Sequence, residues 1–241
     1  MALIGTKLPT RAGAGGAGIR IPDPPDPDPF ADPLSVALLD LIFERGYEAI
    51  DEQAIARRAD TSLEEFYRRF TDRRDCTVKT MELCVRDFEW LVESSYMTGV
   101  DWQEGLRACA WAAADYVDEH RQLVWVLTVG LLQAKSEMLR VMREEWLMYG
   151  ARIIERGRAA APDPDMVPAG AALNAMGSIA QLLTHRMQKG EINSSPHEAV
   201  PQLLYLSVRP YLGEEAARQE LHAPRPPGSF ITRRTPRLQA A

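Results

Sequence analysis

The sequence has few of the residues on which metal centres and disulfide frameworks are built. Its three cysteines, Cys76, Cys84 and Cys109, include no CxxC pair. An odd and widely spaced set argues against a disulfide framework and against a structural zinc site, so we expect buried free thiols. The four histidines are scattered and form no helical ExxH pair, which argues against a di-iron bundle. We therefore expect no cofactor and no metal.

Long apolar runs and strand-like alternation are also missing. No apolar run reaches the roughly 18 residues that a transmembrane helix needs, and the N-terminus lacks the layout of a secretory signal. We therefore expect a cytoplasmic protein with no membrane partner. Because no window sustains a period of two residues, we expect no sheet and assign an all-α fold. The sequence shows no Ser-His-Asp set, HExxH motif or phosphate-binding glycine loop, so we do not expect an enzyme.

Positive charge is not in excess either, because the formal net charge is −6. This balance argues against a generally basic nucleic-acid binder. It does not exclude a small basic face on an acidic protein, since phosphate contact is a local property.

The two ends of the chain have the composition of disordered segments. Residues 1–33 are rich in Gly, Ala, Pro and Asp, and prolines within 22–29 prevent a continuous helix. This arm could reach a DNA minor groove, although an inert tail is the favoured interpretation. We also predict a disordered basic tail over residues 223–241. The basic residues of the two ends are Lys7, Arg11, Arg20, Arg225, Arg233, Arg234 and Arg237.

Between these ends, residues 34–76 predict three short helices and the start of a longer one. Helical spacing of apolar residues begins at Leu34 and ends at Gly46. Asp51 and Ser62 are placed to cap the next two helices, and Glu65 stands at capping-box spacing from Ser62. The turn at residues 60–61 between them has the spacing of a helix-turn-helix motif, whose second helix enters the DNA major groove.

The rest of the chain predicts a succession of longer helices. Asp72 is placed to cap a helix that continues to about residue 97. Ser195 is placed to cap the last helix, in which Pro201 could mark a restart and Pro210 should cause a kink or an end. The helices expected between them cover residues 102–119, 122–132, 136–160 and 168–189, and the last one covers 195–212.

The segment 38–88 resembles the N-terminal DNA-binding domain of the tetracycline-repressor (TetR) family of transcription regulators. The resemblance implies an all-α protein with a three-helix helix-turn-helix domain, here residues 34–80, and a helical-bundle ligand-binding and dimerisation domain, here residues 81–222. Asp60 stands where a turn glycine is usual, and Asp tolerates the left-handed conformation better than most residues. The features that carry the resemblance are Phe43, Gly46, Tyr47, Ile55, Ala56, Ala59, Ser62, Phe66, Tyr67, Phe70, Asp72 and Arg73.

Several residues around the predicted turn could contact DNA. Arginine guanidinium groups suit phosphate oxygens, and the exposed start of a recognition helix can touch base edges. Arg68 and Arg69 are adjacent and cannot share one helix face, so one of them could be a surface residue without this role. The predicted DNA-binding residues are Arg57, Thr61, Ser62, Leu63, Glu64, Tyr67, Arg68, Arg69 and Arg73, with Arg74 as a further phosphate candidate. Phe43, Ile55, Phe66 and Phe70 are predicted to pack in the core.

Aromatic and methionine side chains in the C-terminal region are candidates to line a ligand pocket. For each of them taken singly, core packing is the favoured interpretation, and the resemblance implies that some of them form a pocket. The predicted pocket residues are Trp111, Tyr116, Trp125, Met138, Met142, Trp146 and Tyr149. The polar candidates to orient a ligand are His120, Asn174, Gln181 and His185.

The last two helices have the residues expected of a dimer interface. Small residues allow close approach of another helix, and leucines supply apolar area. The predicted interface residues are Gly170, Asn174, Gly177, Gln181, Leu203 and Leu206.

These features predict a ligand-responsive transcription regulator. We expect a repressor that binds a near-palindromic operator in double-stranded DNA as a homodimer and is released by a small apolar ligand. The alternative is a small-molecule-binding or interaction module of the same fold with weak or lost DNA binding. The excess of Asp and Glu over Lys and Arg in residues 34–88 and the pair Leu63-Glu64 favour that alternative.

Overall fold

The computed structural model describes residues 26, 28–130, 137–189 and 195–226. In this part of the chain every regular element is helical. The predicted all-α fold is therefore confirmed. The arm residues Lys7, Arg11 and Arg20 and the tail residues Arg233, Arg234 and Arg237 lie outside the described residues.

The first three helices are short and form the head of the molecule. Side-chain oxygens cap their N-termini: Asp32 accepts from the backbone N–H groups of residues 34 and 35, Asp51 from that of residue 54, and Ser62 from that of residue 65. The caps predicted at Asp51 and Ser62 are confirmed. The head comprises α1 (Pro33–Arg45), the 3-10 turn η1 (Tyr47–Ala49), α2 (Glu52–Arg58) and α3 (Leu63–Arg69).

The turn between α2 and α3 depends on one residue in the left-handed region. Asp60 has φ 51°, and among the described residues it is the only one other than glycine with a positive φ. The backbone N–H of Thr61 donates to the carbonyl of Ala56 at 3.0 Å, which closes the turn. Asp60 thus replaces the usual glycine, as the sequence predicts.

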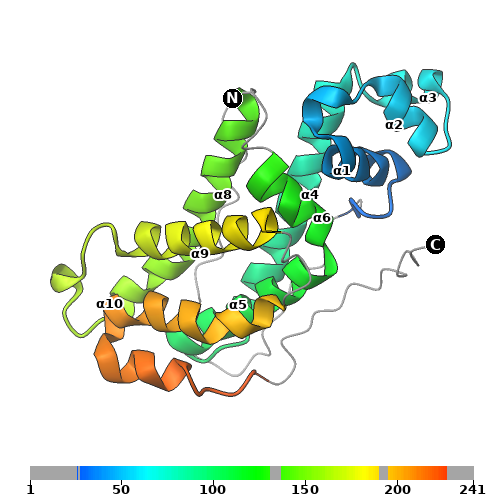
Figure 1. Ribbon diagram of the computed structural model, residues 1–241. Helices are drawn as coiled ribbons and strands as arrows, with labels where there is room; N and C mark the ends of the chain where they lie inside the picture. Colours follow the sequence, from blue (N-terminus) through cyan, green and yellow to red (C-terminus); the bar gives the residue numbers. More distant parts are fainter. Residues whose placement is uncertain (1–25, 27, 131–136, 190–194, 227–241) are drawn as a thin grey trace.

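The body of the molecule is built from longer helices. Its elements are α4 (Arg73–Tyr96), α5 (Trp102–Glu119), α6 (Arg121–Trp125), the π-helical turn η2 (Val126–Gly130), α8 (Glu137–Glu155), the 3-10 turns η3 (Arg156–Ala160) and η4 (Pro164–Met166), α9 (Ala171–Gln188), the 3-10 turn η6 (Pro196–Ala199) and α10 (Val200–Glu220). The helix predicted over 102–119 is α5 without any change of boundary. Figure 1 shows α4 leading from the head into the body, where it lies beside α5.

Two predictions for the last helix need correction. The hydroxyl of Ser195 does not cap a helix, because it forms a hydrogen bond with His197 Nδ1 at 2.9 Å. Pro201 does mark a restart, since it stands in the first turn of α10. The break predicted at Pro210 occurs instead at Gly213, whose φ of 83° only glycine adopts readily.

The described part of the chain contains two large hydrophobic clusters. One fills the head and extends to buried residues of α4, α5, α6 and α8, and the other fills the body. Cys76, Cys84 and Cys109 are buried and free, as expected. Among the described helices, none combines the length and the hydropathy that a membrane span requires.

A buried ion pair holds the end of α10 against α5. The carboxylate of Glu220 is fully buried and accepts hydrogen bonds from Arg107, at 2.7 and 2.8 Å, and from Gln103. Because removal of one partner leaves a charge uncompensated, Glu220→Ala should lower the free energy of unfolding by about 3 kcal/mol. Urea unfolding followed by circular dichroism measures this change. The control Glu215→Ala removes an exposed carboxylate from the same helix and should stay within about 0.5 kcal/mol of wild type. Equal effects of the two substitutions would contradict the assignment.

Candidate functional site

Helix α3, which the sequence predicts as a recognition helix, presents its polar side and its first turn to solvent. Phe66 is fully buried, whereas Leu63 and Tyr67 are 37% and 52% exposed. Ser62 and Glu64 are exposed as well, and Thr61 is half-buried. The face that carries the predicted base-contacting residues is therefore accessible to a macromolecular surface.

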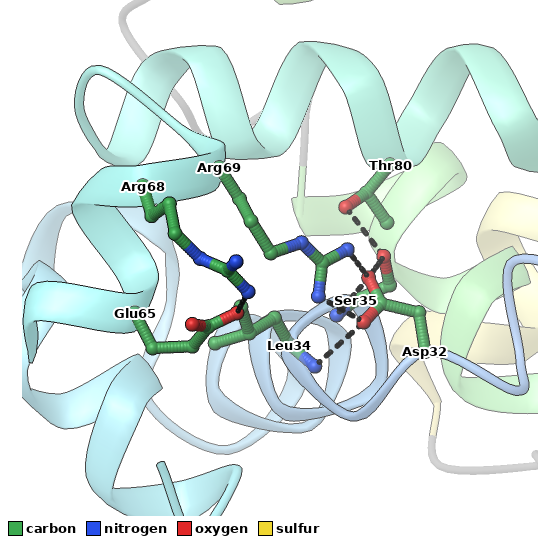
Figure 2. A network of polar contacts seen from close by, with 7 residues as sticks. All are labelled: Asp32, Leu34, Ser35, Glu65, Arg68, Arg69 and Thr80. Atoms are coloured by element: carbon green, nitrogen blue, oxygen red, sulfur yellow. Dashed lines mark hydrogen bonds and ion pairs between the residues drawn. The ribbon is translucent and has the colours of Figure 1, made fainter. Parts of the chain in front are cut away.

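Arg69 lies on the other side of α3 and contacts the start of α1 (Figure 2). Its guanidinium donates two hydrogen bonds to the carboxylate of Asp32, at 2.8 and 2.9 Å. Asp32 also accepts from the hydroxyl of Ser35 at 2.7 Å, and that hydroxyl lies 3.1 Å from the hydroxyl of Thr80 on α4. One polar network thus connects α3, α1 and α4.

Arg73 also has its partners inside the head. Its guanidinium donates to the carbonyl oxygens of Tyr47 and Ile50 and lies over the Tyr47 ring at 4.3 Å from the centroid. Its backbone N–H donates to the carboxylate of Glu52 at 2.9 Å. This side chain therefore anchors the loop before α2 to the start of α4.

Arg57 and Arg68 are predicted phosphate-contacting arginines whose side chains are exposed, as is that of Arg74. Arg57 bonds the carbonyl of Gln53 on its own helix at 3.3 Å. Arg68 is 74% exposed and forms an ion pair with Glu65 at 2.6 Å. Figure 2 shows the Arg68 and Arg69 side chains with different partners, Glu65 and Asp32. An exposed ion pair contributes little free energy, so Arg68 can exchange Glu65 for a phosphate at small cost.

The body contains a partly open apolar cavity of about 190 Å³. Side chains from α4, α5, α6, η2, α8, α9, η6 and α10 form its wall. Tyr116, Trp146 and Tyr149 line it, as predicted. The phenol groups of Tyr116 and Tyr149 donate to the backbone carbonyls of Cys84 and Glu89.

The other predicted pocket residues lie elsewhere. Trp111 stacks against His197, with centroids 5.9 Å apart, and Trp125 packs edge-on against Phe43 of the head at 5.2 Å. Met142 is buried in the hydrophobic cluster that includes the head. The side chain of Met138 lies outside the described residues.

The polar lining of the cavity differs from the predicted set. Asn174, Gln181 and His185 are exposed, and His120 stacks on Phe30 with centroids 3.8 Å apart. The charged side chains among the lining residues are instead Arg121 and Arg186. The sequence holds a signal for Arg186, since it lies at helical spacing from the lining residues of α9 at 179, 182 and 183.

Thiols form part of the same wall and are uncharged. Burial raises the pKa of Cys109 to about 12 and raises the pKa of Cys84 further. Both therefore behave as small apolar groups near neutral pH.

The predicted dimer residues divide between the surface and the cavity. Gly170, Asn174, Gly177 and Gln181 lie exposed along α9, and a Cβ added at Gly177 would meet no atom within 4 Å. Leu206 on α10 is 47% exposed. Leu203 instead lines the cavity.

A Ser–His–Asp chain that the sequence analysis missed connects η6 to α5. Ser195 Oγ lies 2.9 Å from His197 Nδ1, and His197 Nε2 lies 2.6 Å from Asp115 Oδ1. Arg225 donates to both oxygens of Asp115, at 2.8 and 2.6 Å. Because Arg225 already balances the charge of Asp115, the carboxylate is less able to stabilise an imidazolium, and we interpret the cluster as a structural junction.

The fold is shared with solved transcription regulators. FadR of Bacillus halodurans, described as a fatty acid degradation regulator, superposes with a TM-score of 0.64 over 76% of this chain and 96% of its own, at 16% identity. The transcriptional regulator FadR of Bacillus subtilis, solved in complex with stearoyl-CoA, gives a TM-score of 0.61 over 74% of this chain and 97% of its own, at 15% identity. No protein-family model and no curated protein matches the sequence. At these identities the likeness shows the all-α fold with its N-terminal helical head.

Substitution of Asp32 tests how much its contact with Arg69 contributes to the stability of the head. Burial acts to raise the pKa of Asp32, but hydrogen bonds from Arg69 and Ser35 outweigh it and hold the pKa below its ordinary value. Asn can cap a helix as well as Asp, so Asp32→Asn removes chiefly the charge. At neutral pH this substitution should lower the free energy of unfolding by about 1–2 kcal/mol, a value reduced because Arg69 is 39% exposed.

The loss of stability that Asp32→Asn causes should itself depend on pH. A carboxyl with a depressed pKa stabilises the folded state above its ordinary pKa and loses this effect as the pH falls through the folded value. The difference between wild type and Asp32→Asn should therefore narrow below about pH 4. Glu48→Gln, an exposed change on η1, is the control. Urea unfolding at several pH values measures both, and a variant as stable as wild type at neutral pH would contradict the role of Asp32.

Proposed function

We propose that the protein is a ligand-responsive DNA-binding transcription regulator of the TetR family. Residues 34–80, with a last helix that continues to about 97, form the DNA-binding domain. Residues 81–222 form the ligand-binding and dimerisation domain. The observation that carries this proposal is the exposed helix α3 in a head that one continuous helix, α4, links to a body with an apolar cavity.

The link between the cavity and the head is direct. Phe88 of α4 lines the cavity, and Thr80, two helical turns earlier, contacts Ser35 of the head network. Tyr116 also lines the cavity, and its ring lies 4.5 Å from His120, which stacks on Phe30 just before α1. A ligand that changes the packing around Phe88 or Tyr116 thereby acts on the position of the head. This is a shift between two states with different DNA affinity.

The ligand that we propose is small and mostly apolar, in keeping with the cavity wall. The neighbour from Bacillus subtilis was solved with stearoyl-CoA, a molecule with a long apolar chain, and this supports the choice of apolar compounds. Binding of the ligand releases the repressor from its operator.

A homodimer completes the proposed mechanism. The exposed small residues of α9 and the exposed Leu206 of α10 are suited to a helix-to-helix interface about a two-fold axis. Such a dimer places two recognition helices about 34 Å apart or more, which requires a near-palindromic DNA site.

The alternative function is a ligand-binding or interaction module without strong DNA binding. The acidic balance of the head favours it, and so does the internal use of Arg69 and Arg73. The two functions differ in how they depend on the exposed arginines.

Substitution of Arg57 and Arg68 by Ala tests for DNA binding with little effect on the fold. Arg69 and Arg73 are less suitable for this test, because their replacement would remove contacts that hold the head together. Binding to a mixed-sequence duplex, followed by fluorescence anisotropy across a salt series, should weaken in the double variant. The slope of log K against log salt should fall by about 0.9 for each lost phosphate contact.

The control is Arg140→Ala, which removes an exposed arginine of α8 that pairs with Glu137 and Glu144. This variant should bind DNA as wild type does. If wild type and the double variant bind equally weakly at low salt while both are folded, the regulator is excluded and the module is favoured.

A further inference from the structure

The end of α10 is followed by a short segment that reaches back to α5. Residues 223–226 have no regular secondary structure, and Figure 1 shows a coil leaving α10 at this point. Pro224 and Pro226 stand on either side of Arg225. Proline fixes φ and favours the extended polyproline II conformation, so such a segment loses little conformational entropy when it is bound.

Arg225 contacts a carboxylate and an aromatic ring on one face of α5. Its Nη2 atom donates to both oxygens of Asp115, at 2.8 and 2.6 Å, and its guanidinium lies over the Trp111 ring at 5.3 Å from the centroid. Trp111 and Asp115 are four positions apart, which places them on the same side of the helix. A carboxylate beside the face of a tryptophan suits a guanidinium, because this group can form a charge-assisted hydrogen bond and a cation–π contact together.

His197 of η6 positions the same two side chains. Its Nε2 atom lies 2.6 Å from Oδ1 of Asp115, and its ring stacks on Trp111 with centroids 5.9 Å apart. Its Nδ1 atom forms a hydrogen bond with the hydroxyl of Ser195 at 2.9 Å, which fixes the orientation of the imidazole. The carboxylate and the indole are thus positioned by α5 and η6, and the segment that carries Arg225 is not needed to bring them together.

Water has access to this contact. The side chains of Arg225 and Asp115 are 32% and 22% exposed. Water and salt compete for the charges of a partly exposed ion pair, so such a pair is weaker than a fully buried one. The contact can therefore open and close without unfolding of the body.

We propose that Trp111, Asp115 and His197 form a recognition site for an arginine that stands between two prolines. The chain's own residues 223–226 occupy this site as an exchangeable ligand, and they act as a strap that ties the end of the chain to α5 and η6. A segment of the same chain has an effective concentration on the order of millimolar when its connection is short, so a weak intrinsic affinity keeps the site filled. The inference does not rest on the proposed DNA binding or on the cavity.

The test offers the strap segment to the full-length protein as a separate peptide. A capped peptide of residues 221–226 is titrated into wild type and into Arg225→Ala, and calorimetry measures the affinity. Arg225→Ala leaves the site empty, so this variant should bind the peptide about tenfold more tightly than wild type, in which the strap competes. The control Arg218→Ala removes an exposed arginine of α10 that pairs with Glu214, and it should bind the peptide as wild type does.

Two further changes assign the binding to the proposed contacts. A peptide with citrulline in place of arginine keeps the shape of the side chain without its charge, and it should bind Arg225→Ala about tenfold more weakly. This comparison leaves the protein unchanged, so it does not depend on the folding of another variant. Asp115→Asn combined with Arg225→Ala should weaken binding of the arginine peptide by a similar factor, and circular dichroism checks that the double variant is folded.

Dilution distinguishes a strap that docks on its own chain from one that exchanges between two copies. Competition within one chain does not depend on protein concentration, so the affinity of wild type for the peptide should stay constant over about a tenfold dilution. Tighter binding on dilution would assign the site to the strap of a second copy and would overturn docking within one chain.

Three results would overturn the recognition site itself. These are equal binding of the peptide by wild type and Arg225→Ala, equal binding of the arginine and citrulline peptides, or no binding of the peptide by a folded Arg225→Ala variant.

Discussion

Helix α4 runs from the head into the body and contributes side chains to both large hydrophobic clusters, as α5 and α8 also do. Cys76 and Met81 are buried with the head, whereas Val92, three turns further along, is buried with the body. Phe88 packs against both clusters. Because a helix cannot bend sharply without losing backbone hydrogen bonds, the proposed mechanism transmits a change of packing at Phe88 to the head as a rigid-body movement. The proposed control of DNA binding by a ligand depends on this constraint.

Five arginines of the head fall into two groups with different contacts. Arg69 and Arg73 hold helices together through Asp32 and through backbone carbonyls, and Arg58 bonds Glu44 with two hydrogen bonds. Arg57 and Arg68 remain at the surface. An acidic protein can in this way keep a small accessible basic face on its head.

Local features of the fold could be predicted from the sequence, and tertiary partners could not. The caps at Asp51 and Ser62 and the left-handed Asp60 depend on residues at most five positions away, so spacing predicts them. The partner of Arg69 is Asp32, 37 positions earlier, and no periodicity in the sequence indicates that these two residues pair. Trp111 and Trp125 are of a residue type common in ligand pockets, but in the structure they pack against His197 and Phe43 instead. The cavity was predicted as a class of site, and Tyr116, Trp146 and Tyr149 were predicted within it, while Arg121 and Arg186 were found only from the structure.

Selection of binding fragments from a random-sequence duplex library at two salt concentrations tests the central claim most directly. The account predicts enrichment of an inverted repeat whose half-sites are separated by about one turn of DNA or more, with weaker enrichment at the higher salt. A folded protein that enriches no sequence at either salt concentration would contradict DNA binding as the function of the head.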